Sequence, residues 1–441
     1  MVRIGPMASP PATLDRRTLL TGLGAAALLP TLSANRAFAW QTRLLTAEAG
    51  SLVLRPGGAD ARPWSIAGPP LKFAQQDTPG FEFRSNLPVA AVLSWRGIDG
   101  VPTIEPLLAQ RPLAAGGAAN FELLLRHAGT FFCDLALLGD GHAKPSRGLP
   151  LIVQESKPVS VDRDEVLLIE EWRVLPDGTA IAPGVEPKDA VPVHTLNGRT
   201  SFEISVRTNE RVRLRFISAC QRSVIATKIE NYEVRTMAID GQPSEPFQAR
   251  NGALVLAPGG RADVFIDVTM PAGTSTPILL HDGKEARPIG KLVVSSEPPI
   301  RPAPLPPAPP LPSNGLPERI ELKGATRVDL ALGGPQGDWV TPASFAASTA
   351  PAFRAKRGRT VVLALANRAA TATVFHLHGH HFRLLDKLDD GWKPFWLDTL
   401  AVEPGQTHRI AFLAEHAGRY LIESAATDWA APRLVRWYAV E

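Results

Sequence analysis

The chain has 441 residues, too many for one ordinary hydrophobic core, and this length suits two to four domains. Its 47 Lys and Arg against 43 Asp and Glu leave a net charge of +4, which excludes the strongly basic footprint of a nucleic-acid-binding protein. The 42 Pro and 36 Gly residues, set between many short apolar runs, favour an all-β protein.

Residues 1–39 have the pattern of a signal peptide. Arg16 and Arg17 directly precede a short apolar run, and Ala37 and Ala39 frame a small-x-small cleavage site. The run is too short to span a membrane as a helix, and the paired arginines favour the twin-arginine (Tat) route, which carries folded proteins. We therefore expect a periplasmic protein that meets the Tat export machinery and has no membrane span in its mature chain. An ordinary Sec signal or a retained anchor is the alternative.

Short apolar runs bounded by turn residues predict β-strands along the rest of the chain. These runs are 52–54, 91–95, 121–125, 149–153, 166–170, 211–216, 360–365, 374–385 and 407–413. In the run 211–216, arginines alternate strictly with apolar residues, which is typical of a strand with one solvent-exposed face. We therefore expect Arg211, Arg213 and Arg215 to form a solvated face rather than a binding patch.

Residues 297–317 are rich in proline, which favours an extended polyproline II conformation that cannot pack a core of its own. We interpret this segment as a semi-rigid linker, with partner docking through a PxxP sequence as the alternative. The β runs fall into three units, 42–156, 157–296 and 318–441, and each has the size of one β-sandwich.

Cys133 and Cys220 are the two cysteines, and they form no CxxC or other metal-ligand spacing. They are either two buried thiols or one disulfide, which export would permit. The sequence leaves both interpretations open.

The most specific motif is FHLHGHHF at residues 375–382, followed by WLDT at 396–399, PGQT at 404–407 and GRY at 418–420. In this order they resemble the HLHGHxF, W-x-D-T, P-G-x-T and G-x-W/Y motifs of the multicopper oxidases. Segments of the first two thirds also resemble this family, namely 64–70, 86–88, 128–132, 148–153, 196–198, 211–217, 238–241 and 257–264. The resemblance covers residues 42–441 and implies three consecutive cupredoxin-like Greek-key β-sandwiches.

The resemblance also implies where copper ligands belong. The family holds a three-copper cluster with four HxH pairs, and its blue copper site uses two His, one Cys thiolate and often a weak axial Met. One HxH pair is present here, at His376 and His378. The other cluster positions fall on Ser94, Arg96, Asp134, Ala136, Glu423 and Ala425, and the blue-site positions fall on Thr373, Ser424, Trp429 and Leu434.

These replacements remove both copper centres. A serine hydroxyl stays protonated near neutral pH and cannot replace the thiolate of a blue site. We expect no cofactor, or at most copper bound weakly at His376 and His378. A zinc or other hydrolytic site built from this pair and a carboxylate is a further alternative.

Three of the replacements are charged, and a buried charge must be paired. We predict that Arg96 bridges Asp134, Glu423 or both, so that an ion-pair network occupies the copper cavity. A fixed guanidinium there repels a metal cation, so the His pair becomes hydrogen-bonded interface residues. His380 and His381 are interpreted as scaffold or surface residues.

Three functions remain as hypotheses. The first is a non-enzymatic envelope scaffold or stabilising protein with an unknown periplasmic or envelope partner, similar to a copper-free, Tat-exported member of the family in the cell-division septal ring. The second is a copper-binding oxidoreductase of the multicopper oxidase type with a residual site at His376 and His378. The third is a small-molecule binder that uses a vacated pocket near Trp396 and Trp429, although Trp429 more simply fills the volume of the blue site.

Overall fold

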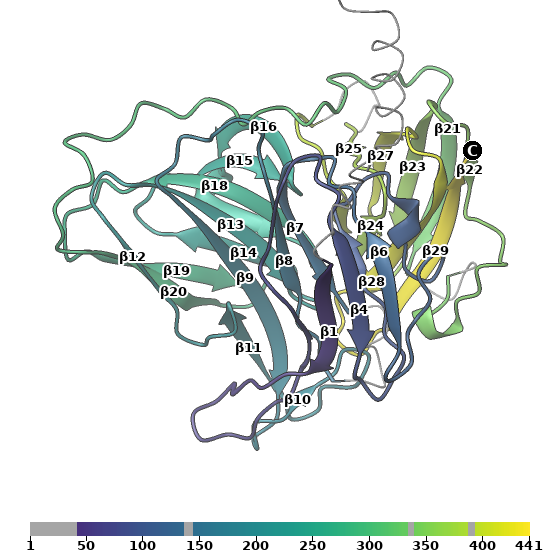
Figure 1. Ribbon diagram of the computed structural model, residues 1–441, viewed down its shortest axis with the longest axis horizontal. Helices are drawn as coiled ribbons and strands as arrows, with labels where there is room; N and C mark the ends of the chain where they lie inside the picture. Colours follow the sequence, from purple (N-terminus) through teal and green to yellow (C-terminus); the bar gives the residue numbers. More distant parts are fainter. Residues whose placement is uncertain (1–41, 136–143, 334–338, 387–392) are drawn as a thin grey trace, which may run out of the picture. The chain divides into compact units, whose positions relative to one another are not determined.

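The computed structural model describes residues 42–135, 144–333, 339–386 and 393–441. Nearly all regular structure in these residues is β-strand, arranged in six sheets, with a few short 3-10 turns (Figure 1). The all-β prediction is therefore confirmed. The predicted signal residues Arg16, Arg17, Ala37 and Ala39, and the predicted ligand position Ala136, lie outside the described residues.

The first β-sandwich consists of two four-stranded sheets, in the orders β2-β1-β4-β6 and β3-β8-β7-β5. Both sheets contribute to one core, which is rich in aromatic side chains such as Phe81, Trp95 and Phe131. Its elements are β1 (Arg43–Ala49), β2 (Trp64–Ala67), β3 (Leu71–Ala74), β4 (Gly80–Ser85), β5 (Ser94–Arg96), η1 (Pro102–Ile104), β6 (Ala118–Glu122), β7 (Gly129–Asp134) and β8 (Leu149–Gln154).

The second β-sandwich packs a seven-stranded sheet on a five-stranded sheet around a core of aliphatic side chains. The larger sheet consists of β9 (Arg163–Val174), β10 (Ala180–Ile181), β11 (Val191–Leu196), β13 (Arg211–Ala219), β15 (Arg235–Ile239), β16 (Gln242–Gln248) and β18 (Arg261–Asp267). The smaller sheet consists of β12 (Glu203–Val206), β14 (Ile225–Ile229), β17 (Ala253–Leu256), β19 (Ser275–His281) and β20 (Ala286–Val294), and η3 (Arg250–Gly252) precedes β17.

The third β-sandwich packs a four-stranded sheet on a five-stranded sheet. The four-stranded sheet consists of β21 (Thr326–Leu332), β23 (Thr360–Asn367), β25 (Arg383–Leu384) and β27 (Thr407–Leu413). The five-stranded sheet consists of β22 (Arg354–Ala355), β24 (Thr373–Leu377), β26 (Thr399–Val402), β28 (Gly418–Ala426) and β29 (Arg433–Val440), and η4 (Pro342–Ser344) precedes β22.

The three sandwiches share one strand pattern. Each of the six sheets contains one parallel pair among antiparallel pairs: β1 with β4, β3 with β8, β9 with β13, β12 with β20, β21 with β23 and β22 with β29. Every sheet also draws all of its strands from only one of the ranges 42–156, 157–296 and 318–441. The same two-sheet unit thus occurs three times in the part of the chain that the structure describes.

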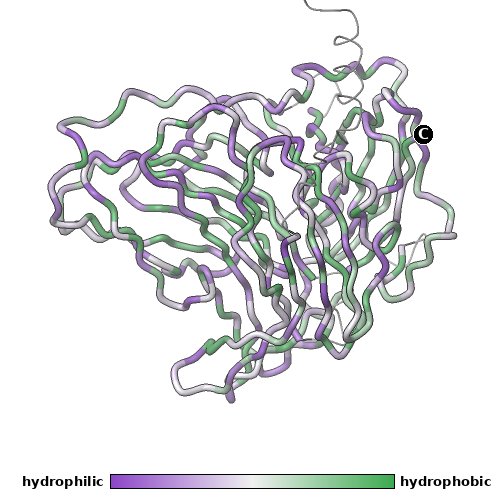
Figure 2. The backbone as a smooth tube through the Cα atoms, viewed as in Figure 1, coloured by the Kyte–Doolittle hydropathy of each residue, from purple (hydrophilic) through white to green (hydrophobic). Residues whose placement is uncertain are grey.

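Hydrophobic and hydrophilic residues alternate along many of the strands (Figure 2). In β3, for example, Leu71 and Phe73 are buried while Lys72 and Ala74 are exposed. Four of the predicted runs, 149–153, 166–170, 360–365 and 407–413, lie within β8, β9, β23 and β27. The runs 166–170 and 360–365 are largely continuous apolar segments, and residues 167–169 of β9 and 361–363 of β23 are buried on both faces.

Four predicted strands are wrong or incomplete. Of the runs 91–95 and 121–125, only residues 94–95 and 121–122 lie in strands, β5 and β6. Residues 52–54 form no strand: Val53 makes only an isolated bridge to Asp60 and is 54% exposed. The run 374–385 divides into β24 and β25 at Gly379, whose φ of +73° turns the chain. A side chain at Gly379 would meet the Tyr420 ring, so the turn requires glycine.

The interpretation of the three alternating arginines is also wrong. The run is part of β13, but Arg211, Arg213 and Arg215 are 1–2% exposed. Arg213 contacts Asp263 at 2.6 Å and Glu155 at 2.7 Å, and Arg215 contacts Asp164 at 2.5 Å. The charged face of β13 is buried because the first sandwich covers Arg213 and Arg215 and residues 305–306 contact Arg211, and each guanidinium pairs with a carboxylate.

Residues 297–317, interpreted from the sequence as a semi-rigid linker, form no strand and pack against the sandwiches. Leu311 is buried against Met237 and Phe265 of the second sandwich. Asn314 hydrogen-bonds both backbone groups of Ala128 in the first sandwich. No helix in the described part of the chain is long and apolar enough to cross a membrane.

Candidate functional site

Strand pairing gathers the predicted site residues from the first and third sandwiches. In the third, β24 pairs with β28 so that His376 lies opposite Glu423. In the first, β5 pairs with β7 so that Ser94 lies opposite Asp134. Because side chains alternate along a strand, Glu423 and Ala425 share one face of β28 while Ser424 points to the other.

Arg96 lies between the two predicted carboxylates. Its Nε donates to Asp134 Oδ2 at 3.3 Å, and its Nη2 donates to Glu423 Oε2 at 2.9 Å. Arg433 Nη1 donates to the same Glu423 oxygen at 2.7 Å. The structure therefore brings Arg96, Asp134 and Glu423 together, and it adds Arg433, which the sequence reasoning missed.

His378 is held by a carboxylate on each side of its ring. Its Nε2 contacts Glu423 Oε1 at 2.7 Å, and its Nδ1 contacts Glu105 Oε1 at 2.8 Å. Burial opposes protonation, but Glu105 and Glu423 outweigh it and raise the pKa of His378 to about 9. His378 is thus a cation at neutral pH, and both of its ring nitrogens carry protons.

No sequence pattern pointed to Glu105. It follows the 3-10 turn η1 and is 4% exposed, and its carboxylate also accepts the backbone N–H of Leu421 at 3.0 Å. With it, three cations (Arg96, Arg433 and His378) face three carboxylates (Asp134, Glu423 and Glu105). Despite burial, these cations hold the pKa of Glu423 well below its ordinary value. We call these six residues the charge cluster.

His376 differs from His378 although only one residue separates them. The Thr399 hydroxyl donates its one proton to Asp398 at 2.7 Å. Thr399 Oγ1 can therefore only accept from His376, so His376 Nδ1 carries the proton and donates it at 3.0 Å. Burial and the charge of Arg96 lower the pKa of His376 to about 3, so this ring is neutral. Its Nε2 has no hydrogen-bond partner among the described residues.

The positions predicted for a blue copper site hold packing residues. Thr373 is fully buried and donates its hydroxyl to Asn367 at 3.1 Å, and Ser424 is also buried. Trp429 is buried, donates from Nε1 to the Ala182 carbonyl of the second sandwich at 3.0 Å, and stacks under the Arg173 guanidinium. Leu434 lies opposite Ser424 on β29.

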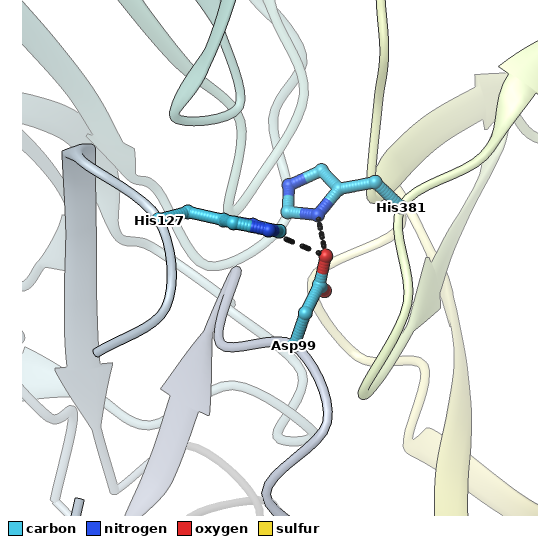
Figure 3. Close-up of side chains that lie close together, drawn as sticks. All are labelled: Asp99, His127 and His381. Atoms are coloured by element: carbon cyan, nitrogen blue, oxygen red, sulfur yellow. Dashed lines mark hydrogen bonds and ion pairs between the residues drawn. The ribbon is translucent and has the colours of Figure 1, made fainter. Parts of the chain in front are cut away.

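His380 and His381 are both buried, so neither is a surface residue. His380 Nδ1 lies 2.7 Å from the Tyr438 hydroxyl. His381 meets Asp99 and His127 of the first sandwich, and these three side chains form a second polar group (Figure 3). The sequence reasoning missed Asp99 and His127, since nothing in the spacing of residues 99, 127 and 381 connects them.

The two cysteines are buried, and they form no disulfide with each other. Burial raises the pKa of both thiols well above the ordinary value, which keeps them protonated. The sequence left open two buried thiols or one disulfide, and the structure shows two buried thiols.

Comparison with known proteins gives the family. Two family models, both described as multicopper oxidase, match residues 166–274 and 319–441, together more than half of the chain. The chain belongs to the multicopper oxidase family. Laccase-1 of Cryptococcus neoformans var. grubii is 24% identical over 246 residues, which span 46% of this chain and only 37% of that relative.

Solved structures of multicopper oxidases share the fold. The Pseudomonas thermotolerans multicopper oxidase has a TM-score of 0.77 at 23% identity, covering 90% of this chain and 98% of that one. Lac15 from a marine microbial metagenome has a TM-score of 0.73 at 24% identity, covering 90% and 99%. McoA of Aquifex aeolicus has a TM-score of 0.70 at 15% identity, covering 91% and 96%. At these identities the likeness establishes the cupredoxin-like fold of this multicopper oxidase family member.

Proposed function

We propose that this protein keeps the multicopper oxidase fold but has lost both copper centres, and that it acts in the periplasm as a non-catalytic scaffold or stabilising protein of the cell envelope. The observation that carries the proposal is the place of Arg96, between Asp134 and Glu423. A guanidinium that is 3% exposed and fixed by two carboxylates repels any cation that would enter the same space.

The donor set does not fit the copper centres that the family implies. Copper binds neutral imidazole, whereas His378 is a cation whose two ring nitrogens donate hydrogen bonds to Glu105 and Glu423. Ser424 offers a hydroxyl where a blue site needs a thiolate. Of the two histidines of the pair, His376 has a ring nitrogen without a hydrogen-bond partner among the described residues, and one ligand holds copper only weakly.

The proposed role at the envelope rests on the sequence. The twin-arginine pattern around Arg16 and Arg17 supports export to the periplasm, and the similarity to a copper-free septal-ring relative supports scaffolding. A protein partner of the envelope is part of this proposal, and a role in division is the example that the relative suggests.

A copper count tests the proposal. The exported mature chain is loaded with Cu(II), loose metal is removed, and copper per chain is measured by elemental analysis beside the visible spectrum. We expect no blue band and no bound copper that is lost in His376→Ala or His378→Ala. Three or more coppers with a blue band would overturn the proposal and restore an oxidase.

The second candidate function is a residual copper site, which the unpartnered Nε2 of His376 favours. The same copper count distinguishes it. About one copper per chain without a blue band, lost in His376→Ala and His378→Ala, would establish it. His281→Ala is the matched control, because that histidine is exposed on β19 of the second sandwich. Capture of an envelope protein by the copper-free chain would support the scaffold role.

A further inference from the structure

Asp99, His127 and His381 come from distant parts of the chain and converge on one point. Asp99 follows β5, and His127 precedes β7, in the first sandwich, while His381 lies between β24 and β25 in the third (Figure 3). One ligand atom from each residue lies within 4.8 Å of the other two. Asp99 and His381 are buried, and the His127 side chain is 10% exposed. None of the three stands at a position where the family's copper ligands are expected.

Asp99 and His127 are spaced as two ligands of one metal ion would be. Asp99 Oδ2 lies 3.4 Å from His127 Nδ1, close to the separation of two ligands about 2.1 Å from one ion. His381 Nδ1 is closer to the same oxygen, at 2.7 Å, because a proton now joins them. Entry of an ion replaces this proton, which leaves to solvent, and the His381 ring moves back by a fraction of an ångström.

His381 is already oriented as a ligand by its second nitrogen. Its Nε2 lies 2.9 Å from the Asp240 carbonyl oxygen of the second sandwich and donates to it. Metal-binding histidines usually donate their other N–H to a backbone carbonyl or carboxylate, which fixes the ring and leaves the first nitrogen for the ion.

Gln242 contacts both histidines of the group. Its Nε2 lies 2.9 Å from His127 Nδ1 and 3.5 Å from His381 Nδ1. Its Oε1 accepts a hydrogen bond from Asn314 Nδ2, which sets the amide nitrogen toward the rings. The lone pair of His127 Nδ1 therefore accepts a hydrogen bond from this N–H group, which must move before an ion can bind the same nitrogen.

Gln242 also lines a cavity of about 310 Å³, together with Arg383, Trp396 and Ser244. Because Gln242 both contacts His127 Nδ1 and lines the cavity, turning its amide toward the cavity would open a path between the two. A fourth coordination position there would face the cavity and accept water or a small ligand.

We propose that Asp99, His127 and His381 form a binding site for a divalent metal ion of the zinc class, with Gln242 as its gate. Two imidazoles and one carboxylate suit Zn²⁺ and the neighbouring first-row ions. The site is separate from the charge cluster, so the proposed loss of the copper centres and this proposal can fail independently.

The test uses the full mature chain, stripped by a chelator and titrated with Zn²⁺ by calorimetry. Co²⁺ serves as a spectroscopic probe, because its visible bands report nitrogen and oxygen ligands. We expect about one ion per chain, and binding at least tenfold weaker in His127→Ala and Asp99→Asn. Thermal unfolding of each variant checks that it is folded. His376→Ala and the exposed His281→Ala are controls that we expect to keep wild-type affinity.

Gln242→Glu is a gain-of-binding variant that does not depend on damaging the site. A carboxylate in place of the amide removes the N–H that faces His127 and supplies a fourth ligand, so Zn²⁺ affinity should rise at least tenfold. Unchanged binding in His127→Ala and Asp99→Asn, loss of binding in His376→Ala, or no Zn²⁺ uptake by the wild type and Gln242→Glu would each overturn the proposal.

Discussion

Arg96 stabilises the contact between the first and third sandwiches by pairing with carboxylates from both. The Arg96 side chain is 3% exposed and the Glu423 side chain is 2% exposed, so little solvent screens the ion pair. Replacing a buried ion pair by apolar residues is often neutral, but removing one partner strands the other charge. A substitution that removes one charge of the cluster should therefore be more destabilising than one that replaces both members of an ion pair.

We predict that Arg96→Ala lowers the free energy of unfolding by about 3–5 kcal/mol, because Asp134 and Glu423 lose a buried cation. Chemical denaturation at pH 7 measures the loss. Arg84→Ala is the matched control: its pair with Glu82 is exposed, and its loss should cost at most about 1 kcal/mol. Equal effects of the two substitutions would contradict the buried network.

His378 makes stability depend on pH. Its pKa is raised to about 9 in the folded protein, above the ordinary value of 6.5. The folded state therefore binds the proton more tightly, and this contribution is complete below pH 6.5 and is lost as pH rises through 9. It amounts to at most about 3 kcal/mol.

We expect the free energy of unfolding to fall between pH 6.5 and 9 and to fall less in His378→Gln, which cannot titrate. Burial also opposes protonation of His381, but Asp99 outweighs it and raises that pKa to about 9, so part of the slope should remain. Denaturation curves at several pH values in this window decide the question. A slope that is identical in the variant would mean that His378 does not titrate there.

At the scale of elements, β7 and β13 meet where the first and second sandwiches touch (Figure 1). Thr130 on β7 donates to Asp263 of β18 at 2.6 Å, and Arg215 of β13 donates to Thr130 at 2.8 Å. The close approach depends on Gly129, which begins β7 with a φ of +145°. Polar side chains of β7, β13 and β18 thus hold the two sandwiches together next to Gly129.

Gly129→Ala should destabilise the protein by at least about 2 kcal/mol. A Cβ there would lie 2.3 Å from the Gly241 carbonyl oxygen, and the positive φ is strained for any other residue. Gly80→Ala, at the start of β4, is the control, because its added Cβ meets nothing within 4 Å. Thermal unfolding of both variants tests this, and equal melting temperatures would contradict the close contact.

At the scale of the whole described unit, buried polar contacts join each pair of sandwiches. Arg96 and Glu423 join the first to the third, Thr130 and Asp263 join the first to the second, and a further pair joins the second to the third. That pair is Arg261 with Asp398, in contact at 2.6 and 3.0 Å. Residues 297–317 follow the surface of the first two sandwiches and add to these joints.

Asn314→Ala should loosen this segment. Its amide satisfies the backbone N–H and C=O of Ala128, which is 4% exposed, so the loss should cost about 1–3 kcal/mol. Faster hydrogen exchange and proteolysis within residues 302–316 are the expected readouts. Ser313→Ala, whose hydroxyl accepts the N–H of Gly315 within the same segment, is the control and should leave both rates unchanged. Unchanged rates in Asn314→Ala would show that other contacts hold the segment.

The sequence alone determined the class of fold, because strand alternation and turn residues are local properties. It also indicated the family, since the motif around His376 and His378 depends on residue order and not on geometry. It located Arg96, Asp134 and Glu423 as charges that must find partners, because an isolated buried charge is too costly. These inferences need no knowledge of which strands face each other.

Tertiary structure alone decided which charged faces are buried and which distant residues meet. The alternation in β13 is compatible with either water or a second sandwich on its charged face, and only packing of the first sandwich buries Arg213 and Arg215. Glu105 and the Asp99–His127–His381 group likewise arise where loops of different sandwiches converge. Such contacts are set by the three-dimensional packing of separate units, and no local periodicity encodes them.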